Sequence, residues 1–228
     1  MAGSASLPLI RRRLGRRDYQ PVWEAMREFT DQRAVDQVDE LWVVEHDPVF
    51  TQGLAGKPEH ILNPQGIPII QTDRGGQVTY HGPGQVVVYP LLDIDRRALG
   101  VRCLVDRLEQ AVIDLLAELE IDSQRQEGAP GVFIDGAKIA SIGLKVRRGR
   151  TYHGLAMNVD MDLSPFSCIN PCGFAGLRMT QLADHRPGID LDQASERLCT
   201  SICRVLGYHE SEIGVVDAPS LASEDALP

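Results

Sequence analysis

The stretch VFIDGAKIASIGLKVRRGRTYHGLAMNVD, residues 132–160, decides the fold class. It consists of short runs rich in β-branched and apolar residues, separated by Asp135-Gly136 and Arg148-Gly149. A dipeptide of the Asp-Gly type between two such runs is a strong signal for a hairpin turn. The stretch therefore predicts a three-stranded meander.

Apolar residues on both sides of this meander recur with a helical period. Over residues 101–119 they recur at i, i+3 and i+4 through several turns and leave Cys103 outside the stripe, which predicts an amphipathic helix. The same pattern predicts a helix over residues 192–206. A further helix is expected over residues 21–38, where Pro21 stands at a position that a first helical turn tolerates.

Three more apolar runs are bounded by Pro or Gly and predict strands at 41–45, 67–71 and 85–92, with a loop rich in Gly and Pro between the first two. Strands in two clusters that helices interrupt predict a mixed-sheet single domain, α/β of the α+β type, rather than a regular βαβ repeat. We expect this domain to span residues 1–216 and a frayed tail to follow over residues 217–228.

The overall composition restricts the function classes. The 228 residues include 23 Lys and Arg against 32 Asp and Glu, a formal charge of -9, which argues against a nucleic-acid-binding protein. No apolar run approaches the length that a bilayer crossing requires and no secretion signal is recognisable, so we expect a cytoplasmic protein without membrane attachment. Five cysteines, an odd number, fit reduced thiols better than a disulfide framework.

An acidic partner of such a protein would have to meet a local basic patch. Two groups of arginines are candidates, although a solvated charged surface is the more common explanation of such groups. They are Arg11, Arg12, Arg13, Arg16 and Arg17 near the start of the chain, and Arg147, Arg148 and Arg150 in the second predicted turn.

Cys172 stands between Pro171 and Gly173 in a segment that predicts a tight, irregular loop. A cysteine in such a loop can be a nucleophile when a cation favours its thiolate, whereas most free cysteines are buried structural thiols. A four-thiolate metal site is a third possibility, because Cys168 and Cys172 could combine with Cys199 and Cys203. Packing in the predicted final helix explains that second pair more simply.

Glycines are concentrated in residues 74–84, RGGQVTYHGPG, which lack both common nucleotide-binding glycine motifs and precede a predicted strand rather than a helix. Closely spaced glycines allow the backbone to approach a ligand, and four side chains could contribute polar groups to the same cleft. A structural cluster of turns competes with this interpretation, and a lone histidine here is more often a core residue than a base. The four side chains are Arg74, Thr79, Tyr80 and His81.

Lys138 follows the first predicted turn and begins an otherwise apolar strand. Taken alone, it is expected to be a surface lysine. If it faces a cleft instead, its charge could favour the Cys172 thiolate, and the two groups would then titrate together. The spacing of 34 residues along the chain does not establish this pairing.

Four segments together resemble one known family, the lipoyl(octanoyl) transferases. They are RGGQVTYHGPGQ at 74–85, KIASIG at 138–143, HGLAMN at 153–158 and NPCG at 170–173, in the order found in that family. The resemblance covers approximately residues 40–185. It implies the catalytic fold of lipoate and biotin protein ligases, and an acyltransferase that uses no cofactor, nucleotide or metal.

The resemblance also implies a reaction and its partners. The octanoyl group of octanoyl-acyl carrier protein would pass through a cysteine thioester to a lysine of the lipoyl domains of 2-oxoacid dehydrogenases and of the glycine cleavage H protein. This transfer begins protein lipoylation.

Carried over residue by residue, the resemblance makes Cys172 the nucleophile and Lys138 the partner that favours the thiolate and shuttles protons. The position of Cys168 is not part of the family's catalytic pattern. The residues implied to line the acyl pocket are Arg74, Gly75, Gly76, Gln77, Val78, Thr79, Tyr80, His81, Ser141, Ile142, Gly143, Gly154, Leu155 and Ala156.

Two alternatives remain open at this point. A lipoate-protein ligase of the same fold would activate a free acid with ATP and would not need a nucleophilic cysteine. A noncatalytic module that binds acylated carriers or lipoyl domains would be insensitive to loss of Cys172.

Overall fold

The computed structural model describes residues 8–217, which build a mixed α/β domain around a seven-stranded sheet. The sheet has the order β10-β1-β2-β6-β9-β8-β7; its first two pairings are parallel and the other four antiparallel. The strands are β10 (Ile213–Asp217), β1 (Leu9–Arg17), β2 (Asp39–His46), β6 (Gln85–Leu91), β9 (Arg150–Asn158), β8 (Ala137–Arg147) and β7 (Gly131–Ile134).

A second, smaller sheet lies beside the first and has the order β4-β3-β5. Its strands are β4 (Ile69–Gln71), β3 (Val49–Gln52) and β5 (Val78–His81). The α-helices are α1 (Tyr19–Gln32), α2 (Val101–Glu118) and α3 (Leu191–Leu206). Short 3-10 turns occur at Pro58–His60, Ser164–Cys168, Pro171–Gly173, Leu182–Asp184 and Glu210–Glu212.

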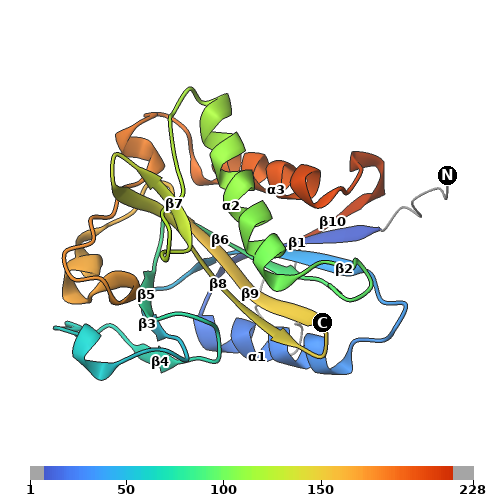
Figure 1. Ribbon diagram of the computed structural model, residues 1–228, viewed down its shortest axis with the longest axis horizontal. Coiled ribbons are helices and arrows are strands. Elements are labelled where there is room, and N and C mark those ends of the chain that lie inside the picture. Colours follow the sequence, from blue (N-terminus) through green and yellow to red (C-terminus); the bar gives the residue numbers. More distant parts are fainter. Residues whose placement is uncertain (1–7, 218–228) are drawn as a thin grey trace.

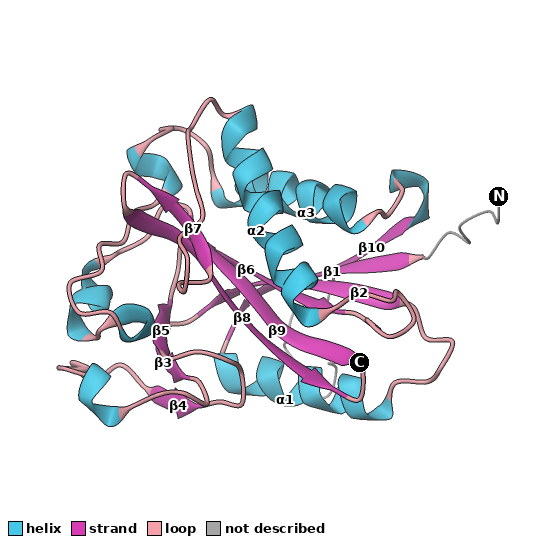
Figure 2. Cartoon of the chain, viewed as in Figure 1, coloured by secondary structure: helices cyan, strands magenta, loops and turns pink. Residues whose placement is uncertain are grey.

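Helices cover both faces of the large sheet. Figures 1 and 2 show α2 and α3 on one face and α1 on the other. The interior strand β2 accordingly alternates: Leu41 and Val43 pack into the core under α2 and α3, while Trp42 and Val44 pack into the core under α1. Because successive side chains of a strand point to opposite faces, the part of β2 that is covered on both sides, residues 41–44, is a continuous apolar run.

The predicted meander is confirmed as β7, β8 and β9, joined by the two predicted turns. The backbone φ angle is positive at both central residues of each turn: 47° and 76° at Asp135 and Gly136, and 51° and 72° at Arg148 and Gly149. Two such residues in succession are the mark of the tight turn whose twist matches that of antiparallel strands. The helices predicted over 101–119 and 192–206 are confirmed within one residue at each end.

Several expectations about the first third of the chain were wrong. Helix α1 ends at Gln32 rather than at 38, the expected loop after β2 contains β3, and the glycine-rich segment contains β5. Strand β1 was not predicted. Of the expected tail, residues 218–228 lie outside the described part of the chain.

The arginines near the start of the chain belong to β1, which lies between β10 and β2 and not in a surface loop. Arg12 Nε lies 2.5 Å from Glu40 Oε2, and Arg11 Nη1 lies 2.9 Å from Glu196 Oε2. These carboxylates offset much of the positive charge that the sequence concentrates there. Within residues 8–217, no helix is both long enough and apolar enough to traverse a bilayer.

Candidate active site

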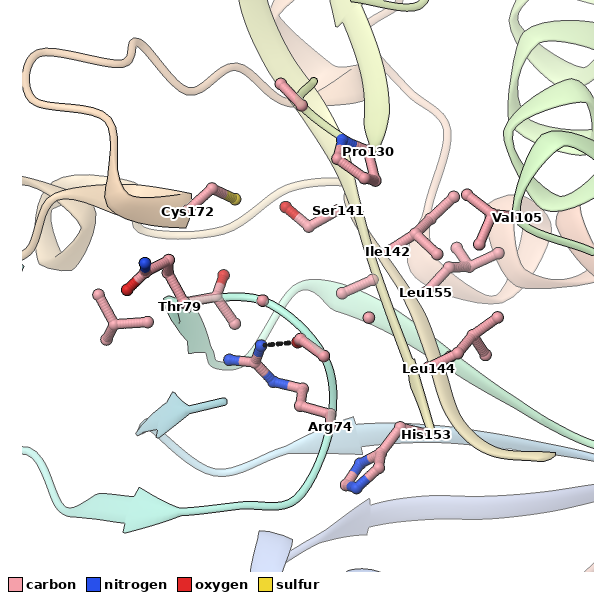
Figure 3. A pocket seen from close by; sticks show the side chains of 18 of the residues that line it. Arg74, Thr79, Val105, Pro130, Ser141, Ile142, Leu144, His153, Leu155 and Cys172 are labelled. Atoms are coloured by element: carbon pink, nitrogen blue, oxygen red, sulfur yellow. Dashed lines mark hydrogen bonds between the residues drawn. The ribbon is translucent and has the colours of Figure 1, made fainter. Parts of the chain in front are cut away.

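A cavity of about 410 Å³ lies between the glycine-rich segment, strands β8 and β9, the start of α2 and the loop that carries Cys172. Figure 3 shows Cys172 and Ser141 pointing toward each other on one side of it, with Arg74 and His153 on another. Apolar side chains from α2, β8 and β9, among them Val105, form a third side. A mainly apolar cavity with a few polar groups is the usual form of a small-molecule site.

The tight turn Pro171–Gly173 brings the Cys172 sulfur into this cavity. Cys172 itself has a φ angle of 56°, in the left-handed region that residues other than glycine rarely occupy. Such strained conformations are concentrated at functional sites because the surrounding structure must hold them. The side chain is half-buried, and Lys138 Nζ lies 3.2 Å from its Sγ.

Lys138 is only 1% exposed, so the expectation of a surface lysine was wrong. Its backbone N–H donates to the Arg178 carbonyl at 2.8 Å, and its carbonyl accepts from Thr180 N–H at 3.0 Å. These bonds hold the first residues of β8 between β7 and the segment that follows Cys172. The ammonium group also lies 5.3 Å from the centre of the Phe133 ring, a favourable position for a desolvated cation.

The glycine-rich segment forms another wall of the cavity, and the buried guanidinium of Arg74 anchors it. Arg74 Nη2 donates to the Thr51 carbonyl at 2.6 Å, and Nη1 donates to the Gly75 carbonyl at 2.9 Å. Burial lowers the pKa of Arg74 below its ordinary value. Gly75 N–H bonds to the Leu144 carbonyl on β8 at 3.0 Å, which ties the segment to the strand beside it.

The end of the cavity that holds His153 is polar, and a partly buried hydrogen-bond network supports it. Asp73 accepts hydrogen bonds from Trp23 Nε1 at 3.0 Å, from the Tyr152 hydroxyl, and from His153 Nε2 at 2.9 Å. Although burial opposes the effect, these hydrogen bonds together hold the pKa of Asp73 below its ordinary value. The Tyr19 hydroxyl lies 3.3 Å from the other ring nitrogen of His153.

His81 and His46 lie close together in the interior, with ring centres 5.9 Å apart. Burial lowers the pKa of His81 to about 3 and that of His46 to about 4. His81 Nδ1 is bonded to Gln85 Oε1 at 2.7 Å, and His46 Nε2 to the Tyr89 hydroxyl at 2.7 Å. The expectation that His81 is a hydrogen-bonded core histidine is confirmed, and its ring also contacts the cavity.

The cavity brings together both predicted catalytic residues and all predicted pocket residues except one. Tyr80 does not line it. Because side chains alternate along β5, Thr79 and His81 face the cavity while the Tyr80 ring packs against Phe50 and Phe166 in a separate core.

Several further residues line the cavity although no sequence motif assigns them a site role. The glycines and the proline of Gly128-Ala129-Pro130-Gly131 are a turn signal that could have drawn attention to this segment. No local pattern in the sequence indicates that residues of α1 or β6 line the cavity. The unassigned lining residues are Tyr19, Val87, Tyr89, Val101, Val105, Gly128, Ala129, Pro130, Leu144, His153 and Phe174.

The other cysteines lie elsewhere. Cys199 and Cys203 are buried against the core on α3, as expected from their helical spacing, and burial raises the pKa values of their thiols to about 12 and about 11. Cys168 is buried and Cys103 is exposed. Within residues 8–217, no group of three or more His, Cys, Asp or Glu side chains is arranged to hold a metal ion.

The arrangement of helices and sheets matches known structures. A bi-partite lipoate protein ligase from Thermoplasma acidophilum matches with a TM-score of 0.68 at 17% identity over 92% of this chain and 87% of that one. A biotin protein ligase from Aquifex aeolicus matches with a TM-score of 0.53 at 13% identity over 88% and 69%. The chain therefore has the catalytic fold shared by lipoate and biotin protein ligases.

Sequence comparison narrows this class. Residues 18–203 match the lipoyl protein ligase A/B catalytic domain family. An octanoyltransferase from Pseudomonas entomophila is 60% identical over 87% of this chain and 93% of its own length, and one from Chromobacterium violaceum is 56% identical over 88% and 97%. The chain belongs to this family and, within it, to the lipoyl(octanoyl) transferases, so it is an acyltransferase.

Proposed function

We propose that this protein transfers an octanoyl group from octanoyl-acyl carrier protein to a specific lysine of lipoyl domains, and that Cys172 carries the group between them as a thioester. The contact of 3.2 Å between Lys138 Nζ and Cys172 Sγ, at the side of a mainly apolar cavity, is the observation that supports it best. The names of the relatives support octanoyl as the acyl group.

The first half of the reaction forms the acyl-enzyme. The Lys138 ammonium stabilises the Cys172 thiolate, which attacks the carbonyl carbon of the carrier thioester. The bond from that carbon to the carrier sulfur breaks, and Lys138 donates a proton to the departing thiolate. One thioester replaces another, so this step needs no external source of energy.

The second half transfers the acyl group to nitrogen. The neutral amine of the acceptor lysine attacks the thioester carbonyl, the bond to Cys172 Sγ breaks, and Lys138 accepts the proton that the amine loses. An amide replaces a thioester, which makes this step favourable. The Cys172 thiolate and the Lys138 ammonium are restored at its end.

The residues around the dyad fit an acyl chain. Ile142, Leu144, Leu155 and Val105 supply apolar surface, and the cavity volume of about 410 Å³ lies within the range of roughly 300–1,000 Å³ typical of small-molecule sites. Exposed Phe174 lines the cavity as well, where it can contact an incoming substrate. Backbone N–H groups of the glycine-rich segment are our candidates for donors to the developing oxyanion.

We assign as acceptors the lipoyl domains of 2-oxoacid dehydrogenases and the glycine cleavage H protein. The similar archaeal ligase was solved as a lipoylation system with its E2 lipoyl domain, which supports an acceptor of this type. We place the reaction in the cytoplasm, with no nucleic acid or membrane as partner. We also propose that neither a nucleotide nor a metal takes part, since thioester exchange requires neither.

Intact and peptide mass spectrometry tests the proposal. The wild type and Cys172→Ser are incubated with octanoyl-acyl carrier protein, without ATP or acceptor. We expect one octanoyl adduct on Cys172 of the wild type, discharged when apo lipoyl domain is added, and none on the variant. Absence of the adduct together with ATP-dependent use of free octanoate would favour the ligase alternative, and an acceptor-binding protein unaffected by Cys172→Ser would favour the noncatalytic module.

A further inference from the structure

Helix α2 buries one acidic side chain, Glu109, among residues that are otherwise apolar. Glu109 lies one helical turn after Val105, which lines the cavity. Burial of a carboxylate is unfavourable unless hydrogen bonds and opposite charge compensate for it. A buried glutamate in an apolar stripe therefore requires partners that explain its position.

Glu109 has two such partners, one on each carboxylate oxygen. Its Oε2 accepts from Arg125 Nε at 2.9 Å, and its Oε1 accepts from the backbone N–H of Gly131 at 2.8 Å. Gly131 is the first residue of β7, which is the edge strand of the large sheet. On the side of β7 away from β8, Phe133 exchanges backbone hydrogen bonds with Gln124 at 2.9 Å, whereas the Gly131 N–H bonds to the Glu109 carboxylate of the helix. Glu109 thus satisfies a backbone donor at the start of the strand.

Gly131 in turn lies against the side chain of Lys138. Its φ angle is 137°, which favours glycine, and a Cβ built on it would lie 2.5 Å from Lys138 Cε and 3.2 Å from Nζ. The same Cβ would lie 2.2 Å from the Ala140 carbonyl oxygen. The bare backbone of Gly131 thus forms one side of the channel in which the lysine side chain extends toward Cys172.

We propose that Glu109 is a positioning residue for the catalytic pair, because its hydrogen bond to Gly131 fixes the wall that directs the Lys138 ammonium to the Cys172 sulfur. This inference rests on the proposed role of the pair and extends it to a residue on α2. Phe133, two residues further along β7, contributes a second fixed surface through its ring. A shift of β7 would move both surfaces relative to Cys172.

The charged and titratable groups around Cys172 show why the position of the Lys138 ammonium affects the reactivity of the thiolate. Arg74 and Lys138 are the cationic side chains that line the cavity with it in the described part of the chain, and His81 and His153 line it too. Burial lowers the pKa values of both histidines below the ordinary value, which favours their neutral forms. Lys138 is the cation in hydrogen-bond contact with the sulfur. Small movements of its ammonium therefore change how well the thiolate is stabilised.

The first test compares Glu109→Gln with Glu109→Met. Glutamine keeps an oxygen that can accept from Gly131 N–H, whereas methionine fills similar space without one. The rate of alkylation of Cys172 by iodoacetamide is measured against pH in a Cys103→Ser background, since Cys103 is exposed, and peptide masses locate the product. We expect the methionine variant to react roughly tenfold more slowly at pH 7 with its profile displaced to higher pH, and the glutamine variant to stay close to the wild type.

A second pair of variants covers the case in which Glu109→Met does not fold. Gly131→Ala places a methyl group against Lys138, while Gly188→Ala is a control with a comparable backbone: its φ angle is 90° and nothing lies within 4 Å of the added Cβ. Both substitutions strain a left-handed glycine. Only Gly131→Ala is expected to slow alkylation of Cys172 and displace its pH profile.

Two results would overturn the inference. One is a folded Glu109→Met or Gly131→Ala protein whose Cys172 alkylation profile equals that of the wild type. The other is an equal effect of glutamine and methionine at position 109, which would assign the role to the charge and not to the hydrogen bond. Alkylation does not involve an acyl substrate, so failure of the proposed function would appear separately, as a missing octanoyl adduct on the wild type.

Discussion

Gly143 on β8 and Gly154 on β9 pair directly with each other in a wall of the cavity. A Cβ on Gly154 would lie 2.1 Å from the Val88 carbonyl oxygen, so the neighbouring strand β6 leaves no space for a side chain there. A Cβ on Gly143 would lie 3.2 Å from the Gly75 carbonyl oxygen and 3.3 Å from Arg74 Cδ. The absence of a side chain at Gly154 therefore allows β9 and β6 to lie close together, and the absence of one at Gly143 allows the glycine-rich segment to lie close to β8.

Substitution of Gly143 by alanine is predicted to reduce the preference for long acyl chains. The added methyl group must displace the segment that lines the cavity or occupy part of its volume. We expect the ratio of kcat/KM for octanoyl over hexanoyl carrier protein to fall by roughly tenfold, the order expected for one methylene in an apolar pocket. Gly100→Ala is the control, because nothing lies within 4 Å of a Cβ at that position. An unchanged ratio would show that Gly143 does not limit the chain.

Loss of the Lys138 ammonium is predicted to make Cys172 less reactive. Methionine at position 138 keeps most of the buried volume and removes the charge that lies 3.2 Å from the sulfur. Iodoacetamide should alkylate Cys172 of Lys138→Met at least roughly tenfold more slowly at pH 7, with the difference closing at high pH. Lys57→Met removes the charge of an exposed lysine and should leave the reaction unchanged. Equal rates for the two variants would contradict the role of Lys138.

The buried histidines predict how stability depends on pH. The pKa values of His46 and His81 fall from 6.5 to about 4 and about 3 on folding, so below pH 6.5 the unfolded chain binds protons that the native protein does not. Stability is therefore fully present above pH 6.5 and is lost as pH falls from there toward the folded values. Each histidine should contribute on the order of 1 kcal/mol of loss between pH 7.5 and 5.5.

Urea unfolding at pH 7.5 and 5.5 measures this loss, and His46→Gln should reduce it. The ordinary pKa values of carboxyl groups, about 4, lie below this interval. Burial also lowers the pKa of His153, which therefore adds to the loss in the same direction. Equal unfolding free energies at the two pH values would show that His46 and His81 are accessible to protons in the native protein.

Much of the fold follows from local patterns in the sequence. The meander and helices α2 and α3 were predicted because their turns and apolar periods are strong local signals. Strand β1 was missed because five of its nine residues are arginines, whose charges find carboxylates on β2 and α3 that no local window contains. Strand β3 and strand β5 are only four residues long and lie among glycines and prolines, which concealed them.

Local sequence patterns predicted less of the candidate site than of the fold. Composition favours a surface position for Lys138, and only the pairing of β7 with β8 and the turn at Cys172 bring its ammonium to the sulfur. The family resemblance supplied this pair because it carries information about the tertiary structure. Tyr80 was placed in the pocket wall because a continuous motif contains it, yet the alternation of β5 turns it into the core.

The turn between β8 and β9 offers a test of donor docking. Arg147 pairs with Asp31 at 3.1 Å, and Arg150 Nη1 reaches the Thr30 carbonyl at 3.4 Å, so both are partly engaged with the end of α1. Arg148 is exposed at the tip of the turn. If this turn helps to bind an acidic carrier, Arg148→Glu should weaken carrier binding at low salt, because it replaces an attraction with a repulsion.

Titration of the carrier protein at low and at physiological ionic strength measures this effect. The wild type should lose affinity as salt rises, and Arg148→Glu should bind more weakly with a smaller dependence on salt, since screening weakens the attraction that the variant lacks. Lys57→Glu reverses a charge at another exposed position and serves as the matched control. Equal losses in both variants would assign the effect to overall charge, and unchanged affinity in Arg148→Glu would remove this turn from the docking surface.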